Sequence, residues 1–111
     1  MSYTHKTIVG VDVIELEDSI DLYSVPELKK FCKELLKKGT KNLVLGMEKL
    51  TFMDSSGLGM LINLGFECGE QGIGLKLAAL SPEIDKLFTL TKIHEKFTIT
   101  GSVNEAIRSF G

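Results

Sequence analysis

Strand-like runs alternate with helix-start signals along this chain, and that order constrains the fold more than any other feature of the sequence. The helix-start signals share a serine followed by a proline or a glutamate, and they fall at residues 24–27, 81–83 and 102–105. A serine side chain can accept hydrogen bonds from free N–H groups of a first helical turn, where proline is tolerated and glutamate can reach back. Strands separated by helices usually pair in parallel, so the order predicts an α/β fold.

The expected order of elements is β-β-α-β-α-β-α-β-α. The strands are predicted at 7–9, 11–16, 42–47, 73–80 and 97–100, and the helices from 24 to 39, from 55 to about 69, from 82 and from 102. Gly10 suits a tight hairpin between the first two strands, and Thr51 to Met53 are expected to lead into a turn. Without repeats or linkers, residues 1–111 are predicted to form one domain. Its sheet should be mixed, mostly parallel after an opening antiparallel hairpin, and packed with about four helices.

Composition narrows the possible functions. The chain is 43% hydrophobic and 25% charged, its net charge is -2 and its pI is about 5.7, so we expect no direct binding of nucleic acid, which needs clustered basic residues. The lysines between 29 and 38 are interpreted as the solvated face of a helix. No apolar run reaches the roughly 18 residues of a membrane span, and no leader is evident, so we expect a cytoplasmic protein without membrane insertion. Cys32 and Cys68 lack CxxC spacing, so neither a metal nor another cofactor is predicted.

The most informative stretch runs from Phe52 to Gly59, with the sequence FMDSSGLG, between a predicted strand and a predicted helix. Backbone N–H groups at a helix start can accommodate an anion, and either Asp54 or Ser55 is a natural N-cap. Gly57 and Gly59 each cost about 1 kcal/mol in a helix relative to alanine. We therefore expect another backbone or a partner surface to approach closely there.

The DSSGLG stretch after an apolar strand resembles the signature of bacterial anti-sigma-factor antagonists. The order of elements is similar to that of the STAS domain over nearly the whole chain. Residues 17–21 resemble the family's segment that ends the second strand, and residues 80–88 resemble its later strand-to-helix passage. Two positions depart from the family pattern: Asp18 stands where glycine is usual, and Gly46 stands where a polar residue is common.

The resemblance implies a phosphorylation switch at Ser55, the serine that directly follows the motif's aspartate. The unphosphorylated chain would bind an anti-sigma-factor serine kinase and so release the sigma factor, and a PP2C-type phosphatase would reset the switch. The partner-binding residues expected beside Ser55 are Asp21, Asp54, Ser56, Gly57, Leu58 and Met60. Met60 is expected to be exposed, because flexible thioethers suit adaptable surfaces. A phosphate at a helix start is compatible with the fold but opposes the docking of a partner.

Other interpretations of the same residues remain open. Ser55 could be a plain helix cap, Ser56 a structural hydroxyl and Asp21 a solvated loop acid. A STAS domain could also serve as an accessory of a membrane transport complex without phosphorylation. An enzyme is not expected, because the hydrolase motif G-x-S-x-G is absent and neither His5 nor His94 has an evident carboxylate to orient it.

Overall fold

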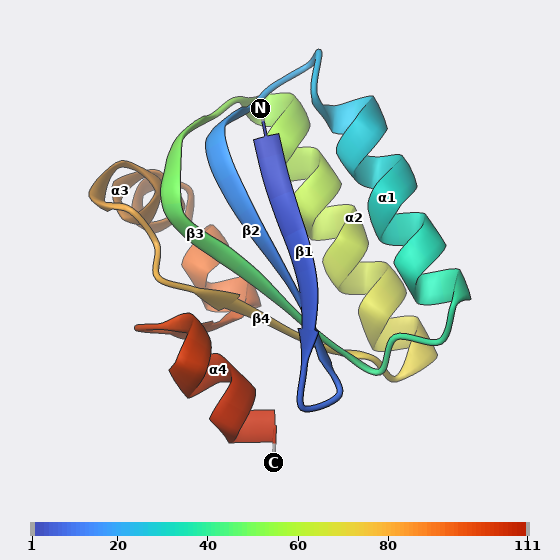
Figure 1. Cartoon of the computed structure of the whole chain (residues 1–111). Helices are drawn as coiled ribbons and strands as arrows, with labels where there is room; N and C mark the ends of the chain where they lie inside the picture. Colours follow the sequence, from blue (N-terminus) through green and yellow to red (C-terminus); the bar gives the residue numbers. More distant parts are fainter. Residues whose placement is uncertain (1, 111) are drawn as a thin grey trace.

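A five-stranded mixed sheet organises the computed structural model, which describes residues 2–110 (Figure 1). The strands are β1 (Ser2–Ile8), β2 (Val11–Ile20), β3 (Asn42–Met53), β4 (Gly74–Ala78) and β5 (Thr98–Thr100), and they lie in that order across the sheet. β1 pairs with β2 antiparallel, and every later pair is parallel. The predicted fold class, with an opening hairpin followed by parallel strands, is confirmed.

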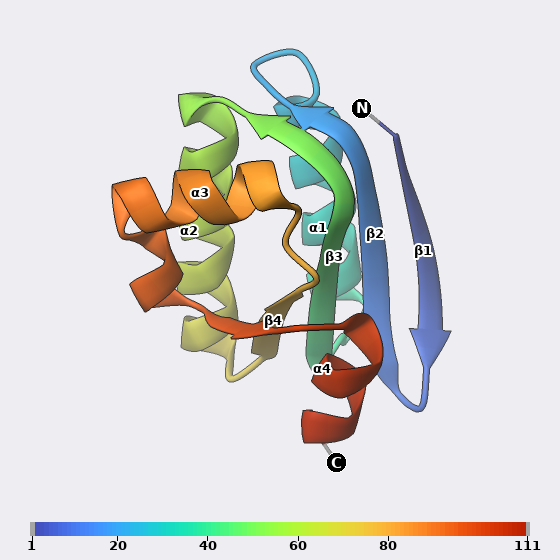
Figure 2. The same cartoon turned by 90° about the vertical axis from the view of Figure 1, so that its left-hand side faces the viewer.

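The helices cover both faces of the sheet. They are α1 (Val25–Lys37), α2 (Ser55–Gln71), α3 (Pro82–Thr91) and α4 (Val103–Phe110), with a short 3-10 helix, η1 (Ile93–Lys96), after α3. Figure 1 and Figure 2 show α1 and α2 side by side along one face, with α4 on the opposite face.

Each face of the sheet has its own core. The larger core joins the sheet to α1, α2 and α3, and it contains fully buried side chains such as Leu45, Leu61 and Phe88. The smaller core lies under α4 and includes Val44 and Ala106. Leu45 and Val44 are neighbours in β3, so their opposite cores follow from the alternation of side chains along a strand.

Two of the three predicted serine caps are confirmed. The Ser81 hydroxyl accepts from the N–H of Ile84 at 3.3 Å, and the Ser102 hydroxyl accepts from the N–H of Glu105 at 3.0 Å. The prediction for Ser24 was wrong: its side chain makes no cap hydrogen bond to α1 and instead accepts from the N–H of Asp21 at 2.9 Å. The Ser24 hydroxyl therefore stabilises the loop before α1 and does not cap the helix.

Backbone conformation explains one departure from the family pattern. The register of β2 against β3 shifts between Asp18 and Ser19, and Asp18 has φ +68°. Glycine adopts this left-handed conformation without a steric cost, whereas most other residues do not. The glycine that is usual in the family suits this positive φ, and Asp18 adopts the same backbone conformation here.

Candidate functional site

Asp54 connects three elements at the start of α2. Its backbone is extended, and its Oδ1 atom accepts from the N–H of Gly57 at 3.0 Å, which makes Asp54 rather than Ser55 the N-cap of the helix. Its Oδ2 atom accepts from the N–H of Leu22 at 3.1 Å, in the loop between β2 and α1. Its own N–H donates to the carbonyl of Ile20 at 3.2 Å. One carboxylate therefore fixes the β2–α1 loop against the first turn of α2.

Asp21 lies in that same loop and orders its backbone. Its Oδ1 atom accepts from the N–H of Ser24 at 3.1 Å and from the N–H of Tyr23 at 3.0 Å. These hydrogen bonds, with the one from Ser24 contributing most, lower the pKa of the Asp21 carboxyl below its usual range. The Leu22–Asp54 hydrogen bond holds this loop, which also contains the Asp21 carboxylate, against the start of α2.

Ser55 and Ser56 occupy the first two positions of α2 and differ in exposure. Ser55 is exposed, whereas Ser56 is half-buried. Within residues 2–110 neither hydroxyl forms a hydrogen bond to another group, and the cap of the helix is made by Asp54. The Ser55 hydroxyl is therefore free to meet another molecule.

The two glycines of the motif have different surroundings. Gly57 is buried, and a Cβ atom there would lie 2.6 Å from Cγ of Met53 and 3.0 Å from the carbonyl oxygen of Ile20. A Cβ at Gly59 would meet nothing within 4 Å. The expected close approach of another backbone is confirmed at Gly57, and within residues 2–110 no such contact explains Gly59.

The expectation that Met60 is exposed was wrong. Only 7% of Met60 is exposed, and it belongs to the larger core. Its place follows from helical geometry: Met60 lies three residues after buried Gly57 and four before buried Leu64, which puts all three on one side of α2. A flexible thioether fills core space here.

The segments that meet at the start of α2 carry exposed apolar side chains, and of these the sequence analysis named only Leu58 as a partner contact. Leu22 is 63% exposed, Tyr23 is 89% exposed and Phe52 is 54% exposed, while Leu58 is half-buried. Leu22 is held by Asp54, and Phe52 precedes Asp54 by two residues. We call Leu22, Tyr23, Phe52 and Leu58 the α2-start surface. Their only signal in the sequence is that Leu22 and Tyr23 fall between a strand and a helix, outside either periodic pattern.

His5 lies away from Ser55. The Nε2 atom of His5 is 2.8 Å from Oδ1 of Asp12, so the expectation that His5 lacks a carboxylate was wrong. This pair lies near the hairpin end of β2, whereas the α2-start surface lies at its other end. The Nδ1 atom of His94 is 3.0 Å from the carbonyl oxygen of Phe88.

Other features of the described residues limit what the site can hold. Cys32 and Cys68 are buried and unpaired by disulfides, and residues 2–110 contain no group of three or more side chains that could hold a metal ion. The same residues include no helix of the length and apolar character that a membrane span requires.

Comparison with known proteins gives consistent results. The sequence model of the STAS domain family matches residues 3–106. The anti-sigma-B factor antagonist of Staphylococcus aureus is 26% identical over 82 residues, which cover 74% of this chain and 76% of that protein. A Thermotoga maritima protein assigned as an anti-sigma factor antagonist superposes with a TM-score of 0.90 at 19% identity, over 96% of this chain and 92% of that one. The Bacillus cell fate determinant SpoIIAA in its phosphorylated form gives a TM-score of 0.79 at 21% identity, over 99% and 100%.

Proposed function

Since the chain belongs to the STAS domain family, we propose that it is an anti-sigma factor antagonist that binds a serine-kinase anti-sigma factor through the start of α2. Phosphorylation of Ser55 switches this binding off, and a PP2C-type phosphatase restores it. The observation that carries the proposal is the exposed, unengaged Ser55 hydroxyl at the first position of α2, next to segments that carry the exposed apolar side chains of Leu22 and Phe52.

The surroundings of Ser55 favour phosphorylation without loss of the fold. The side chain points to solvent, so an added phosphate keeps its hydration. The positive end of the α2 dipole interacts favourably with the new charge, typically by about 0.3–1 kcal/mol. Asp54 lies next to it in the chain and opposes the new charge. These two contributions are small and opposite, so the stability of the folded state changes little.

The same phosphate has a larger effect on binding. A partner that covers the start of α2 together with Leu22, Tyr23 and Phe52 removes water from these apolar side chains and from Ser55. A phosphate carries about -1.5 to -2 charges at pH 7 and would lose its hydration in that interface. Ionised Asp21, in the adjoining loop, adds repulsion. The phosphate therefore lowers the affinity for the kinase and leaves the stability of the fold nearly unchanged.

The partner-binding residues expected from the sequence divide into two groups under this proposal. Asp21, Asp54, Ser56 and Leu58 form or border the contact, since each is at least partly exposed. Gly57 and Met60 support the contact from beneath, because both are buried. Gly59 joins the contact: its missing side chain leaves open space in which a partner backbone can approach.

The proposal is tested by mass spectrometry and by binding. After incubation with ATP and the candidate kinase from the same organism, one added phosphate should map to Ser55, and a PP2C-type phosphatase should remove it. Ser55→Ala should bind the kinase with unchanged affinity and resist release by ATP. Ser55→Asp should bind roughly 10- to 100-fold more weakly, as expected for an uncompensated charge in an interface.

A matched control separates charge at the site from charge in general. Ser102 is the N-cap of α4, on the opposite face, and aspartate is also a good N-cap. Ser102→Asp should therefore keep both kinase binding and melting temperature. Wild-type affinity in Ser55→Asp, or no phosphate on Ser55 with a kinase that is active on another substrate, would contradict the proposed switch.

A further inference from the structure

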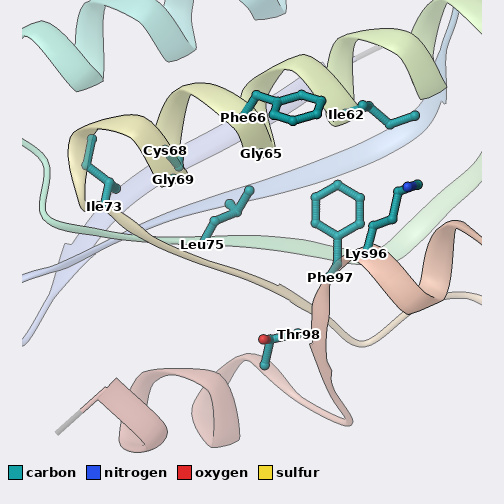
Figure 3. Close-up of a pocket in the computed structure, with 10 residues that line it drawn as sticks. All are labelled: Ile62, Gly65, Phe66, Cys68, Gly69, Ile73, Leu75, Lys96, Phe97 and Thr98. Atoms are coloured by element: carbon teal, nitrogen blue, oxygen red, sulfur yellow. The ribbon is translucent and has the colours of Figure 1, made fainter.

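A second apolar surface lies at the other end of α2, away from Ser55. It is a groove of about 450 Å³ between the C-terminal half of α2 and residues Lys96–Thr98. Figure 3 shows the ring of Phe97 directed toward α2 at Gly65, with the Lys96 side chain beside it. Phe66, on the rim, is 68% exposed. Small-molecule sites are commonly concave, mostly apolar and of 300–1,000 Å³, so the size and lining of this groove fit a small ligand.

Two glycines of α2 shape the groove in different ways. A Cβ atom at Gly65 would lie 3.1 Å from Cε1 of Phe97, so this glycine makes room for the ring. A Cβ at Gly69 would meet nothing within 4 Å, although Gly69 also lines the groove. Glycine weakens a helix interior relative to alanine, and nothing within the described chain uses the space that it leaves here. The groove is therefore open at a position where a side chain would fit.

The charge of the groove indicates the chemistry of its ligand. Lys96 is the only charged residue that lines it, and among residues 2–110 no carboxylate forms an ion pair with the Lys96 ammonium group. The remaining walls are supplied mainly by Ile62, Phe66, Ile73, Leu75 and Phe97. An apolar channel with one unpaired cation at its edge complements a molecule with an apolar tail and a single negative charge.

We propose that this groove binds an amphipathic carboxylate, with its alkyl tail along Phe66 and Phe97 and its carboxylate at Lys96. The site is independent of the kinase-binding surface, because none of its lining residues belongs to the α2-start surface. Each methylene that becomes buried should tighten binding about fourfold, so dodecanoate should bind roughly 15-fold more tightly than decanoate.

The test is an NMR titration of the 15N-labelled chain with dodecanoate below its micelle concentration. Saturable shifts are expected at the amides of Gly65, Gly69 and Thr98. Dodecyltrimethylammonium, which has the same tail and the opposite charge, should bind at least roughly threefold more weakly. Lys96→Gln should weaken dodecanoate binding by a similar factor, and it should tighten binding of the ammonium compound because it removes a like charge.

Two leucine substitutions provide a blocked site and a matched control. A Cβ at Gly69 would meet nothing within 4 Å, so Gly69→Leu should place its side chain in the groove and abolish saturable dodecanoate binding. Gly59→Leu adds the same side chain to the same helix at another open position outside the groove, and it should leave dodecanoate binding intact. Kinase binding should show the opposite pattern: the kinase should bind Gly59→Leu more weakly than the wild type and Gly69→Leu with unchanged affinity. Failure of either proposal is therefore distinguishable from failure of the other.

Three results would overturn the ligand proposal. One is dodecanoate binding that does not saturate or that survives Gly69→Leu. Another is equal affinity for the carboxylate and the ammonium compound. The third is a shift of the groove amides with protein concentration alone, which would assign the groove to contact with a second copy of the chain.

Discussion

Gly57 and Gly59 provide a direct test of how the start of α2 is built. A Cβ at Gly57 would lie 2.6 Å from Cγ of Met53 and 3.0 Å from the carbonyl oxygen of Ile20, whereas a Cβ at Gly59 would meet nothing within 4 Å. The Met53 side chain can move, but the Ile20 carbonyl also accepts the 3.2 Å hydrogen bond from the N–H of Asp54. Relief of the contact at Gly57 therefore displaces the turn that carries the cap.

The expected magnitudes follow from two opposing contributions. Replacing a helical glycine with alanine stabilises by about 1 kcal/mol, and forcing a methyl group into packed space costs about 1–3 kcal/mol. Gly59→Ala should raise the free energy of unfolding by about 1 kcal/mol, and Gly57→Ala should lower it by about 1 kcal/mol. The gain in helix propensity is common to both variants, so their difference of about 2 kcal/mol measures the steric cost at Gly57.

Guanidinium denaturation followed by circular dichroism measures these differences. Both variants should keep the wild-type dependence of free energy on denaturant concentration, so that the shifts in midpoint report stability. In thermal unfolding the two variants should differ by about 8 °C. A Gly57→Ala protein as stable as Gly59→Ala would refute the view that Gly57 is required by close packing against β2 and β3.

Three further predictions concern other parts of the chain. Val9 has φ +51° in the two-residue turn between β1 and β2, so Val9→Asn should relieve backbone strain and raise the melting temperature by about 4 °C. Burial raises the pKa of Asp12, but hydrogen bonds from His5, Thr40 and Thr7 outweigh it and lower the pKa overall. The Asp12 carboxylate therefore stabilises the fold above its unfolded pKa, and this contribution is lost as the pH falls through the lower folded pKa. In denaturation experiments, Asp12→Asn should lower the free energy of unfolding by about 1 kcal/mol at pH 7, and this loss should shrink below about pH 4. Burial raises the pKa of Cys32 to about 12 and that of Cys68 to about 11, so a disulfide reagent at pH 8 should label both only in denaturant.

The order of elements could be predicted from the sequence because most of its signals are local. The caps at Ser81 and Ser102 and the motif cap at Asp54 each depend on a few neighbouring residues. Strand ends were less accurate: β3 continues to Met53, although Thr51 to Met53 were expected to lead into a turn. This extension depends on pairing with the far end of β2, where Ile20 lies opposite Met53, and such pairing leaves no mark in a local pattern.

In the candidate site, too, locally encoded features were predicted correctly and features that depend on tertiary packing were not. The motif identified Asp54 and Ser55, because a capping aspartate and the adjacent serine are local features. Met60 was assigned to the surface from its chemical character, although its position in the helix places it in the core. Ser24 was assigned to the cap of α1, but its hydroxyl accepts a hydrogen bond from the N–H of Asp21 and makes none to the helix. The exposure of Tyr23 depends on tertiary packing, and the sequence does not encode it locally.

The first turns of α2 separate residues that govern stability from residues that govern affinity. Residues three or four apart lie on one side of a helix, so buried Gly57 shares its side with buried Met60, while exposed Ser55 shares the other side with Gly59. A change on the inner side alters packing against β2 and β3 and therefore the free energy of unfolding. Under the proposed function, a phosphate on the outer side alters what can dock and leaves that packing intact. Under the proposed function, the modification can change affinity without unfolding the chain, because Ser55 and Gly57, two residues apart, lie on roughly opposite sides of the helix.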